Sequence, residues 1–220
     1  MVTIEWLGHA CFLIRGSRVS VIIDPFAQES GLLYPAIDVH ADVVLVSHEH
    51  LDHNCVAAVR GAPRVIRGQG EWSAPMSIRG ITANHDASGG ALRGKTTIYA
   101  FELDGISFCH LGDLGEIPTD EVVRRIGAVD VLMIPVGGFF TIDHEGADTV
   151  VDMLRPKLVI PMHYKTEFVT FQLDPVDKFI SGKKEAKFQE TNSISVDRGA
   201  LPARTEIVVL APPGARTRLR

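Results

Sequence analysis

A short apolar run and a dense group of polar side chains meet in the stretch Val43-Val44-Leu45-Val46-Ser47-His48-Glu49-His50-Leu51-Asp52-His53. Residues 43–46 form a continuous apolar run that is too short for a helix, which is typical of a strand buried on both faces. The polar part contains four candidate metal ligands, His48, His50, Asp52 and His53. Imidazole and carboxylate groups suit zinc, manganese and iron. Because side chains at the end of a strand share one cleft, the stretch predicts a metal site.

The composition bounds what surrounds this stretch. A chain of 220 residues with 45% hydrophobic and 22% charged residues is long enough for one large core, and we expect a single α/β domain over residues 1–220. The formal net charge is -5, and no block of like charges interrupts the sequence. This balance does not favour a nucleic-acid partner.

The cysteines and the hydropathy pattern bear on location. The three cysteines, Cys11, Cys55 and Cys109, show no regular spacing, which argues against a disulfide framework and fits a reducing compartment. The amino terminus has no basic region, and no apolar run reaches the roughly 18 residues of a membrane span. We therefore expect a cytoplasmic protein without a membrane partner.

Periodicity predicts a strand-rich chain. Runs rich in β-branched and aromatic residues at 3–6, 10–14 and 19–23 predict three strands joined by hairpins, and Asp24-Pro25 ends the third. Further strands are expected at 77–83, 96–103, 106–111, 129–135, 157–162 and 206–210, and helices at 54–60, 119–125, 144–154 and 175–180. Strands followed by a ligand-bearing loop occur both before and after residue 95. This repetition predicts two similar halves, roughly 1–95 and 96–220.

Three more candidate ligands, His85, Asp113 and His163, stand where later strands are expected to end. The intervals between them are long enough for the chain to return to the same sheet edge. His48 and His50 point alike from an extended segment, so the set suits two metals better than one closed tetrahedral site. Two metals that share a water lower its pKa toward neutrality, and a carboxylate such as that of Asp113 can bridge them.

Several motifs together resemble the metallo-β-lactamase superfamily. The resemblance covers residues 1 to about 170. Within the superfamily, the sequence is similar to small metal-dependent hydrolases, a group that includes the ascorbate-6-phosphate lactonases. The matching segments are Trp6-Leu7-Gly8-His9-Ala10, Ile23-Asp24-Pro25, His48-x-His50-x-Asp52-His53, His110-Leu111-Gly112-Asp113, Pro135-Val136-Gly137-Gly138 and Pro161-Met162-His163-Tyr164.

The resemblance implies a fold and a ligand set. The fold would be a four-layer αβ/βα sandwich with a dinuclear site at one edge. One metal would be held by His48, His50 and His85, the second by Asp52, His53 and His163, and Asp113 would bridge them. Asp52 and Asp113 would also be catalytic, while His9 and Asp24 would support the ligands from below. Zinc is the first expectation, and manganese and iron remain open.

Four residues are candidates for orienting an anionic small-molecule substrate: Arg93, Lys95, Tyr164 and Lys165. The alternative for the basic residues is an ordinary solvated face. Two further histidines, His110 and His144, compete for a place in the site, although His110 should face away from Asp113. Assembly into a homo-oligomer is left open.

The function implied is hydrolysis of an ester, lactone or phosphoester of a small molecule by a metal-bridged hydroxide. The fold alone cannot name the substrate. Two alternatives remain: a phosphodiesterase or nuclease that acts on nucleotides or nucleic acid, and a metal-binding module without catalysis.

Overall fold

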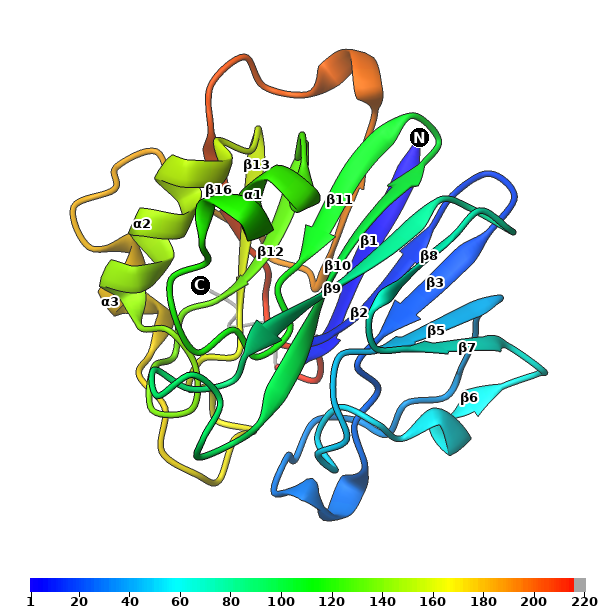
Figure 1. The fold of residues 1–220 in the computed structure, drawn as a ribbon, viewed down its shortest axis with the longest axis horizontal. Coiled ribbons are helices and arrows are strands. Elements are labelled where there is room, and N and C mark those ends of the chain that lie inside the picture. The colour runs from blue at the N-terminus through cyan, green and yellow to red at the C-terminus, as the bar shows by residue number, and fades with distance from the viewer. Residues whose placement is uncertain (216–220) are drawn as a thin grey trace.

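The computed structural model describes residues 1–215, which form two large β-sheets packed against each other (Figure 1). Across the first, six-stranded sheet the order is β15 (Ser193–Val196), β1 (Val2–Gly8), β2 (Cys11–Arg15), β3 (Ser20–Ile23), β5 (Val43–Val46) and β7 (Arg64–Arg67). Across the second, eight-stranded sheet it is β14 (Lys187–Phe188), β16 (Glu206–Val209), β13 (Leu158–Met162), β12 (Val131–Pro135), β11 (Ile106–His110), β10 (Lys95–Leu103), β9 (Ile78–Asn84) and β8 (Gly70–Trp72). A small pair joins β4 (Val39–His40) to β6 (Val59–Arg60).

The central strands of the six-stranded sheet, β2, β3 and β5, are largely apolar on both faces because both faces are covered there. On β2, Phe12 and Ile14 point into the core between the sheets, while Cys11 and Leu13 point to the outer face. β5 follows the same alternation, as the period of two in a strand requires. The continuous apolar run 43–46 is therefore a strand buried on both faces, as its sequence predicts.

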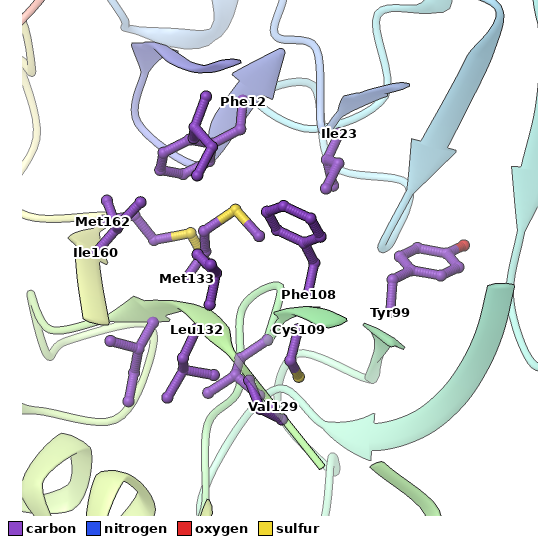
Figure 2. Packing of buried hydrophobic residues seen from close by; sticks show 14 of the residues in the cluster. Phe12, Ile23, Tyr99, Phe108, Cys109, Val129, Leu132, Met133, Ile160 and Met162 are labelled. Carbon is purple, nitrogen blue, oxygen red and sulfur yellow. The ribbon is translucent and has the colours of Figure 1, made fainter. Parts of the chain in front are cut away.

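The core between the sheets is filled by large side chains from both. Figure 2 shows Phe12 and Ile23 of the first sheet facing Phe108, Met133 and Met162 of the second. All five side chains are almost fully buried. This dry interface fixes the two sheets against each other, and with them the strand ends that carry the polar residues.

Helices cover the outer face of the eight-stranded sheet. They are α1 (Asp120–Ile126), α2 (His144–Leu154) and α3 (Val176–Ile180), and Figure 1 shows them on one side of the molecule. Asp143 caps α2 by accepting a hydrogen bond from Gly146 N at 2.9 Å, and Ala147, Val150 and Leu154 are buried at helical spacing. Within the described residues, no helix combines the length and the apolar character needed to cross a membrane.

The outer face of the six-stranded sheet is covered by loops in place of a helix. Phe26, Leu32 and Tyr34 from the connection after β3 pack there together with Val169. Three-residue 3₁₀ turns are the helical pieces in the loops, namely η1 (Gln28–Ser30), η2 (Val56–Ala58) and, after β15, η3 (Arg198–Ala200).

The helix expected at 54–60 is wrong. Asn54 does not cap a helix, because its side-chain amide donates to the carbonyl of Glu49 at 3.0 Å. Cys55 N donates to Pro25 O at 2.7 Å, which diverts the backbone from helical pairing. The chain makes one 3₁₀ turn and then enters β6, where the β-branched Val59 is buried.

The two sheets do not coincide with the expected halves 1–95 and 96–220. β8 and β9 precede residue 95 but belong to the second sheet, and β15 returns to the first. One feature recurs in both sheets: an aspartate before a parallel strand accepts the backbone and hydroxyl hydrogens of a serine on the neighbouring strand. The pairs are Asp42 with Ser20 and Asp130 with Ser107. The division into two similar halves stays a prediction, as does the cytoplasmic location.

Candidate metal centre

Strand direction explains why distant polar residues meet. β1 and β3 are both antiparallel to β2, so they run the same way, and β5 is parallel to β3. In the second sheet β9 and β11 are both antiparallel to β10, and the parallel series continues through β12 to β13. The carboxyl ends of these strands lead to the sequence-predicted residues: His9 after β1, Asp24 after β3, the 48–53 segment after β5, His85 after β9, Asp113 shortly after β11 and His163 after β13.

A close approach of backbones joins the two sheets at this edge. Gly112 has φ +53°, and a Cβ at this position would lie 2.5 Å from Thr96 Oγ1 and 2.9 Å from Ser47 Cβ. Thr97 N also donates to Ser47 O at 2.9 Å. Only glycine fits, and its absence of a side chain lets the loop that carries Asp113 reach the histidine segment.

Asp24 organises the histidine segment from below. Its carboxylate is fully buried and accepts hydrogen bonds from Ser47 N (2.7 Å), Ser47 Oγ (2.6 Å) and His53 Nδ1 (2.9 Å). Since Ser47 Oγ donates to Asp24, it accepts from His48 Nδ1 at 2.9 Å. In their neutral forms, His48 and His53 therefore both carry the proton on Nδ1 and leave Nε2 unprotonated.

Asp113 lies where four imidazoles converge. Its Oδ2 atom is 3.2 Å from Nε2 of both His53 and His163, 3.4 Å from that of His85 and 3.8 Å from that of His48. Burial would raise the pKa of Asp113, but the nearby His163 and His53 outweigh it and hold the pKa well below its usual value. An ionised carboxylate is thus fixed at the centre of a nitrogen-rich pocket.

The donor atoms fall into three groups whose members lie within 4.8 Å of one another, and each group could hold a metal ion. The groups are His48, His50 and His85; His9, Asp52, His53 and His163; and His48, His53 and Asp113. Several buried atoms of the cluster have no hydrogen-bond partner among the described residues, including His53 Nε2 and Asp113 Oδ1. Buried polar atoms without partners are costly, so this donor set fits divalent cations that would satisfy them.

Comparison with known proteins identifies the family of the chain. A family model described as a beta-lactamase superfamily domain matches residues 3–163. A "UPF0173 metal-dependent hydrolase" of Methanoculleus marisnigri is 33% identical over 187 residues, which are 74% of this chain and 81% of the relative. The chain belongs to the metallo-β-lactamase superfamily. A second relative of the same description, from Thermococcus kodakarensis, is 33% identical over 195 residues, or 76% of this chain and 86% of its own.

The fold of this superfamily member also matches a solved structure. A metallo-β-lactamase superfamily protein of Thermotoga maritima superposes with a TM-score of 0.82 at 36% identity, covering 96% of this chain and 98% of that chain. The expected mixed α/β fold of the metallo-β-lactamase type is therefore confirmed, and so is the resemblance inferred from the sequence motifs. The outer layer of loops on the six-stranded sheet is the local departure from four regular layers.

The histidines differ in charge. Burial lowers the pKa of His9 to about 4 and that of His48 to about 3, and neighbouring histidines add to the effect, so both rings are neutral at pH 7. Burial would also lower the pKa of His53, but the carboxylates of Asp113 and Asp52 outweigh it and raise the pKa well above its usual value. Neutral imidazole is the form that binds metals, so a cation at His53 must displace a proton.

His9 lies in the cluster itself, closer than the supporting position expected from the sequence. Its Nε2 is 3.3 Å from Asp52 Oδ2, and its ring centroid is 4.0 Å from that of His163. Its carbonyl accepts from Trp6 Nε1 (2.9 Å) and from His163 N (3.2 Å). Three residues of this superfamily site have a left-handed backbone, His9 (φ +52°), Asp24 (φ +49°) and His163 (φ +52°). Such backbone is uncommon outside glycine and is often found at functional sites.

A cavity of about 360 Å³ opens above the cluster. Its lining combines cluster residues with one arginine and two phenylalanines: His50, Asp52, His85, Arg93, Asp113, Phe140, His163 and Phe171. The sequence reasoning missed Phe140 and Phe171, because aromatic residues in loops carry no periodic signal. It also missed the relay through Ser47, although a serine directly before the ligand segment is a visible hint.

The four residues predicted to contact substrate lie in different surroundings. Arg93 lines the cavity, and Lys95 lines a neighbouring one of about 480 Å³. Tyr164 is buried with its ring 5.3 Å from that of Trp6, and the Lys165 ammonium donates to Val169 O (2.6 Å) and Phe171 O (2.8 Å). Lys165 therefore anchors the loop after β13, and neither it nor Tyr164 lines the cavity, so their contact with substrate stays a prediction.

The two competing histidines are not part of the donor groups found in residues 1–215. His110 Nε2 donates to Ala10 O at 2.9 Å, and its Nδ1 accepts from Gly112 N at 3.1 Å, so both ring nitrogens are used. His110 is a buried structural histidine that ties β11 to the segment after β1. His144 is the first residue of α2 and does not line the cavity.

Proposed function

We propose that the protein is a metal-dependent hydrolase of small molecules, with two divalent cations, zinc in the first place, as its cofactors. The observation that carries the proposal is the convergence of four imidazole Nε2 atoms on Asp113 Oδ2 at 3.2 to 3.8 Å. Relatives in the UPF0173 group are named metal-dependent hydrolases, and the Thermotoga protein is described as a candidate Zn-dependent hydrolase. The reaction class we propose is cleavage of an ester, lactone or phosphoester.

The chain's residues divide between two cation positions. His48, His50 and His85 would hold one, Asp52, His53 and His163 the other, and Asp113 would contact both. When bound, the cations would lower the pKa of a shared water toward neutrality and polarise the group that is attacked.

The acidic side chains can accept protons but cannot supply them at neutral pH. Burial would raise the pKa of Asp52, but His53 and His9 outweigh it and hold the pKa well below its usual value. Asp52 is therefore an ionised ligand and proton acceptor, and it lines the cavity where a substrate would lie. His9 Nε2 lies 3.3 Å from this carboxylate. Asp24 and Ser47 keep the His53 and His48 rings in the tautomers that ligation needs.

The cavity size supports a small substrate. A volume of about 360 Å³ is at the low end of the range for sites that bind small molecules. A nucleic-acid strand needs a groove lined by cations, and the cavity lining includes one arginine and no lysine. The phosphodiesterase alternative would thus be confined to small nucleotides.

Elemental analysis of the purified protein, followed by a hydrolase substrate panel, tests the proposal. The variant Asp52→Ala should lose bound metal and turnover together. Glu49→Ala is a matched control, because this neighbouring acid is exposed and paired with Arg67 at 3.5 Å. Full activity in Asp52→Ala, or a wild-type protein that takes up no metal, would overturn the proposed function, and turnover of nucleotide diesters alone would favour the phosphodiesterase.

A further inference from the structure

The Arg93 guanidinium stands in the cavity without a carboxylate partner. It lies 5.1 Å from the centre of the Phe140 ring, and it is the one lysine or arginine that lines the cavity. Within residues 1–215, no aspartate or glutamate oxygen lies within 4.0 Å of it, and its side chain makes no hydrogen bond. A half-buried guanidinium has five donors in a rigid fork, so an unpaired one beside an aromatic wall is poised for an oxyanion.

The other cations nearby are already engaged. Arg67 pairs with Glu49 at 3.5 Å, and Lys95 Nζ donates to Gly89 O at 3.0 Å and to Asn84 Oδ1. Both line the adjacent cavity, which shares His50 and Arg93 with the first. Arg93 is thus the side chain at this edge that is both cationic and free.

Asp86 holds the backbone that carries Arg93. Its carboxylate is buried and accepts four backbone N–H groups from the loop that follows, those of Ser88 (2.8 Å), Gly90 (3.1 Å), Leu92 (3.0 Å) and Arg93 (2.8 Å). His85 N donates to Gly94 O at 3.1 Å and closes the loop at its base. The residue next to the expected ligand His85 therefore fixes the position of the arginine. A loop ordered before binding loses less conformational entropy when ligand arrives.

We propose that Arg93 is the receptor for a carboxylate or phosphate group of the substrate, and that the substrate is a small ester or lactone with this oxyanion away from the bond that is cleaved. This inference rests on the proposed hydrolase function. Phe140 and Phe171 would pack against the carbon skeleton between the two ends, while the cluster faces the reacting group. A protein of net charge -5 repels anions in general, so the free guanidinium inside the cavity is the local feature that would attract one.

A matched pair of esters tests the inference kinetically. Para-nitrophenyl hemisuccinate carries a carboxylate, and para-nitrophenyl acetate has the same leaving group without it. Arg93→Ala should lower kcat/KM for the hemisuccinate by about 10- to 100-fold through the loss of charge-assisted hydrogen bonds. The acetate should change little, and metal content should be unchanged. Arg67→Ala, which removes the same charge beside the neighbouring cavity, should leave the preference intact. Equal losses for both esters in Arg93→Ala would overturn the inference while leaving the hydrolase function standing.

A second measurement does not depend on turnover. Phenylglyoxal modifies arginines, and peptide mass spectrometry of the metal-loaded protein gives the rate for each one. The stable amide analogue of the hemisuccinate should slow the labelling of Arg93 several-fold more than the neutral acetanilide does, with Arg67 as the reference. A phosphonate analogue in a parallel arm tells which oxyanion fits better. Absence of selective protection by either anion would overturn the inference even if no ester is hydrolysed.

The role of Asp86 has its own signature as a positioning residue. Asp86→Asn keeps the size but replaces two carboxylate acceptors by one acceptor and one donor, so the loop loosens. KM for the hemisuccinate should rise with kcat nearly unchanged, and the acetate kinetics should stay the same. A loss of kcat for both esters, or a loss of metal, would show that Asp86 supports His85 instead of Arg93.

Discussion

Replacement of Asp24 by asparagine is the sharpest test of how the metal site is built. The Asp24 carboxylate receives two hydrogen bonds from Ser47 and one from His53. In Asp24→Asn, the amide oxygen can still accept from Ser47 N, but the NH₂ group then faces Ser47 Oγ and His53 Nδ1. Both must now accept. The proton of His53 moves to Nε2, and the released Ser47 hydroxyl donates to His48 Nδ1 and moves that proton too.

The magnitude follows from the hydrogen bonds that must be lost. Metal ligation requires bare Nε2 atoms, which forces the asparagine to turn its NH₂ group toward the backbone N–H of Ser47. Two buried donors then face each other, at a cost of about 1–3 kcal/mol. Since 1.36 kcal/mol is a factor of ten, we expect metal affinity to fall about 10- to 100-fold, which is the size seen when outer partners of ligand histidines are removed.

Competition titration against a coloured zinc chelator measures this affinity, and circular dichroism melting shows whether the variant folds. Asp42→Asn is the matched control, because Asp42 makes the same bonds to Ser20 at the protein surface, 2.8 Å to its N and 2.7 Å to its Oγ. A folded Asp24→Asn protein with wild-type metal affinity would refute the tautomer argument. An equal loss of metal affinity in Asp42→Asn would show that the effect is not specific to the hydrogen bonds of Asp24.

Two further outcomes are expected. His110→Ala removes a ring that is hydrogen-bonded to Ala10 O and Gly112 N, and it leaves a buried void. Chemical denaturation should therefore show a free energy of unfolding lower by about 3 kcal/mol, with the same amount of metal bound per folded molecule. A loss of metal would instead make His110 a ligand. Burial would raise the pKa of Asp130, but the hydrogen bond from Ser107 N and the nearby Lys157 outweigh it and lower the pKa. The ionised Asp130 therefore stabilises the fold above the unfolded pKa near 3.8, and this stabilisation is lost as pH falls through the folded pKa. The melting temperature should therefore fall less steeply from pH 7 to pH 3 in Asp130→Asn than in the wild type. The same dependence of melting temperature on pH in both proteins would contradict this.

The sequence predicted the strands well because their apolar runs are governed by local physics. Residues 43–46 and 131–135 are continuous apolar runs, and both form buried strands. The helices expected at 119–125 and 144–154 also form, and in the structure Thr119 and Asp143 cap their amino ends. The helix predicted at 54–60 does not form, because groups that it would need are bonded elsewhere. The Asn54 side chain donates to Glu49 O, and Cys55 N donates to the distant Pro25 O.

The site was harder, since it is made by tertiary contacts. A cluster of histidines is visible in one segment, but the arrangement of His85 and His163 around Asp113 depends on strand directions across two sheets. The four backbone hydrogen bonds of Asp86 become visible only once the loop is closed. The bonds of Lys165 to two backbone carbonyls are likewise not visible in the sequence, where it stands as a lysine beside an expected ligand.

The left-handed backbone at His9, Asp24 and His163 lowers the stability of the fold at the positions that build the metal site. Each such residue costs about 1–3 kcal/mol, and glycine would remove most of that cost. The backbone alone would thus favour glycine at these positions, and the histidine and aspartate side chains found there serve the site. A library screened for heat resistance alone should accumulate substitutions at His9 and His163, and such a screen would outline the functional site without any substrate in hand.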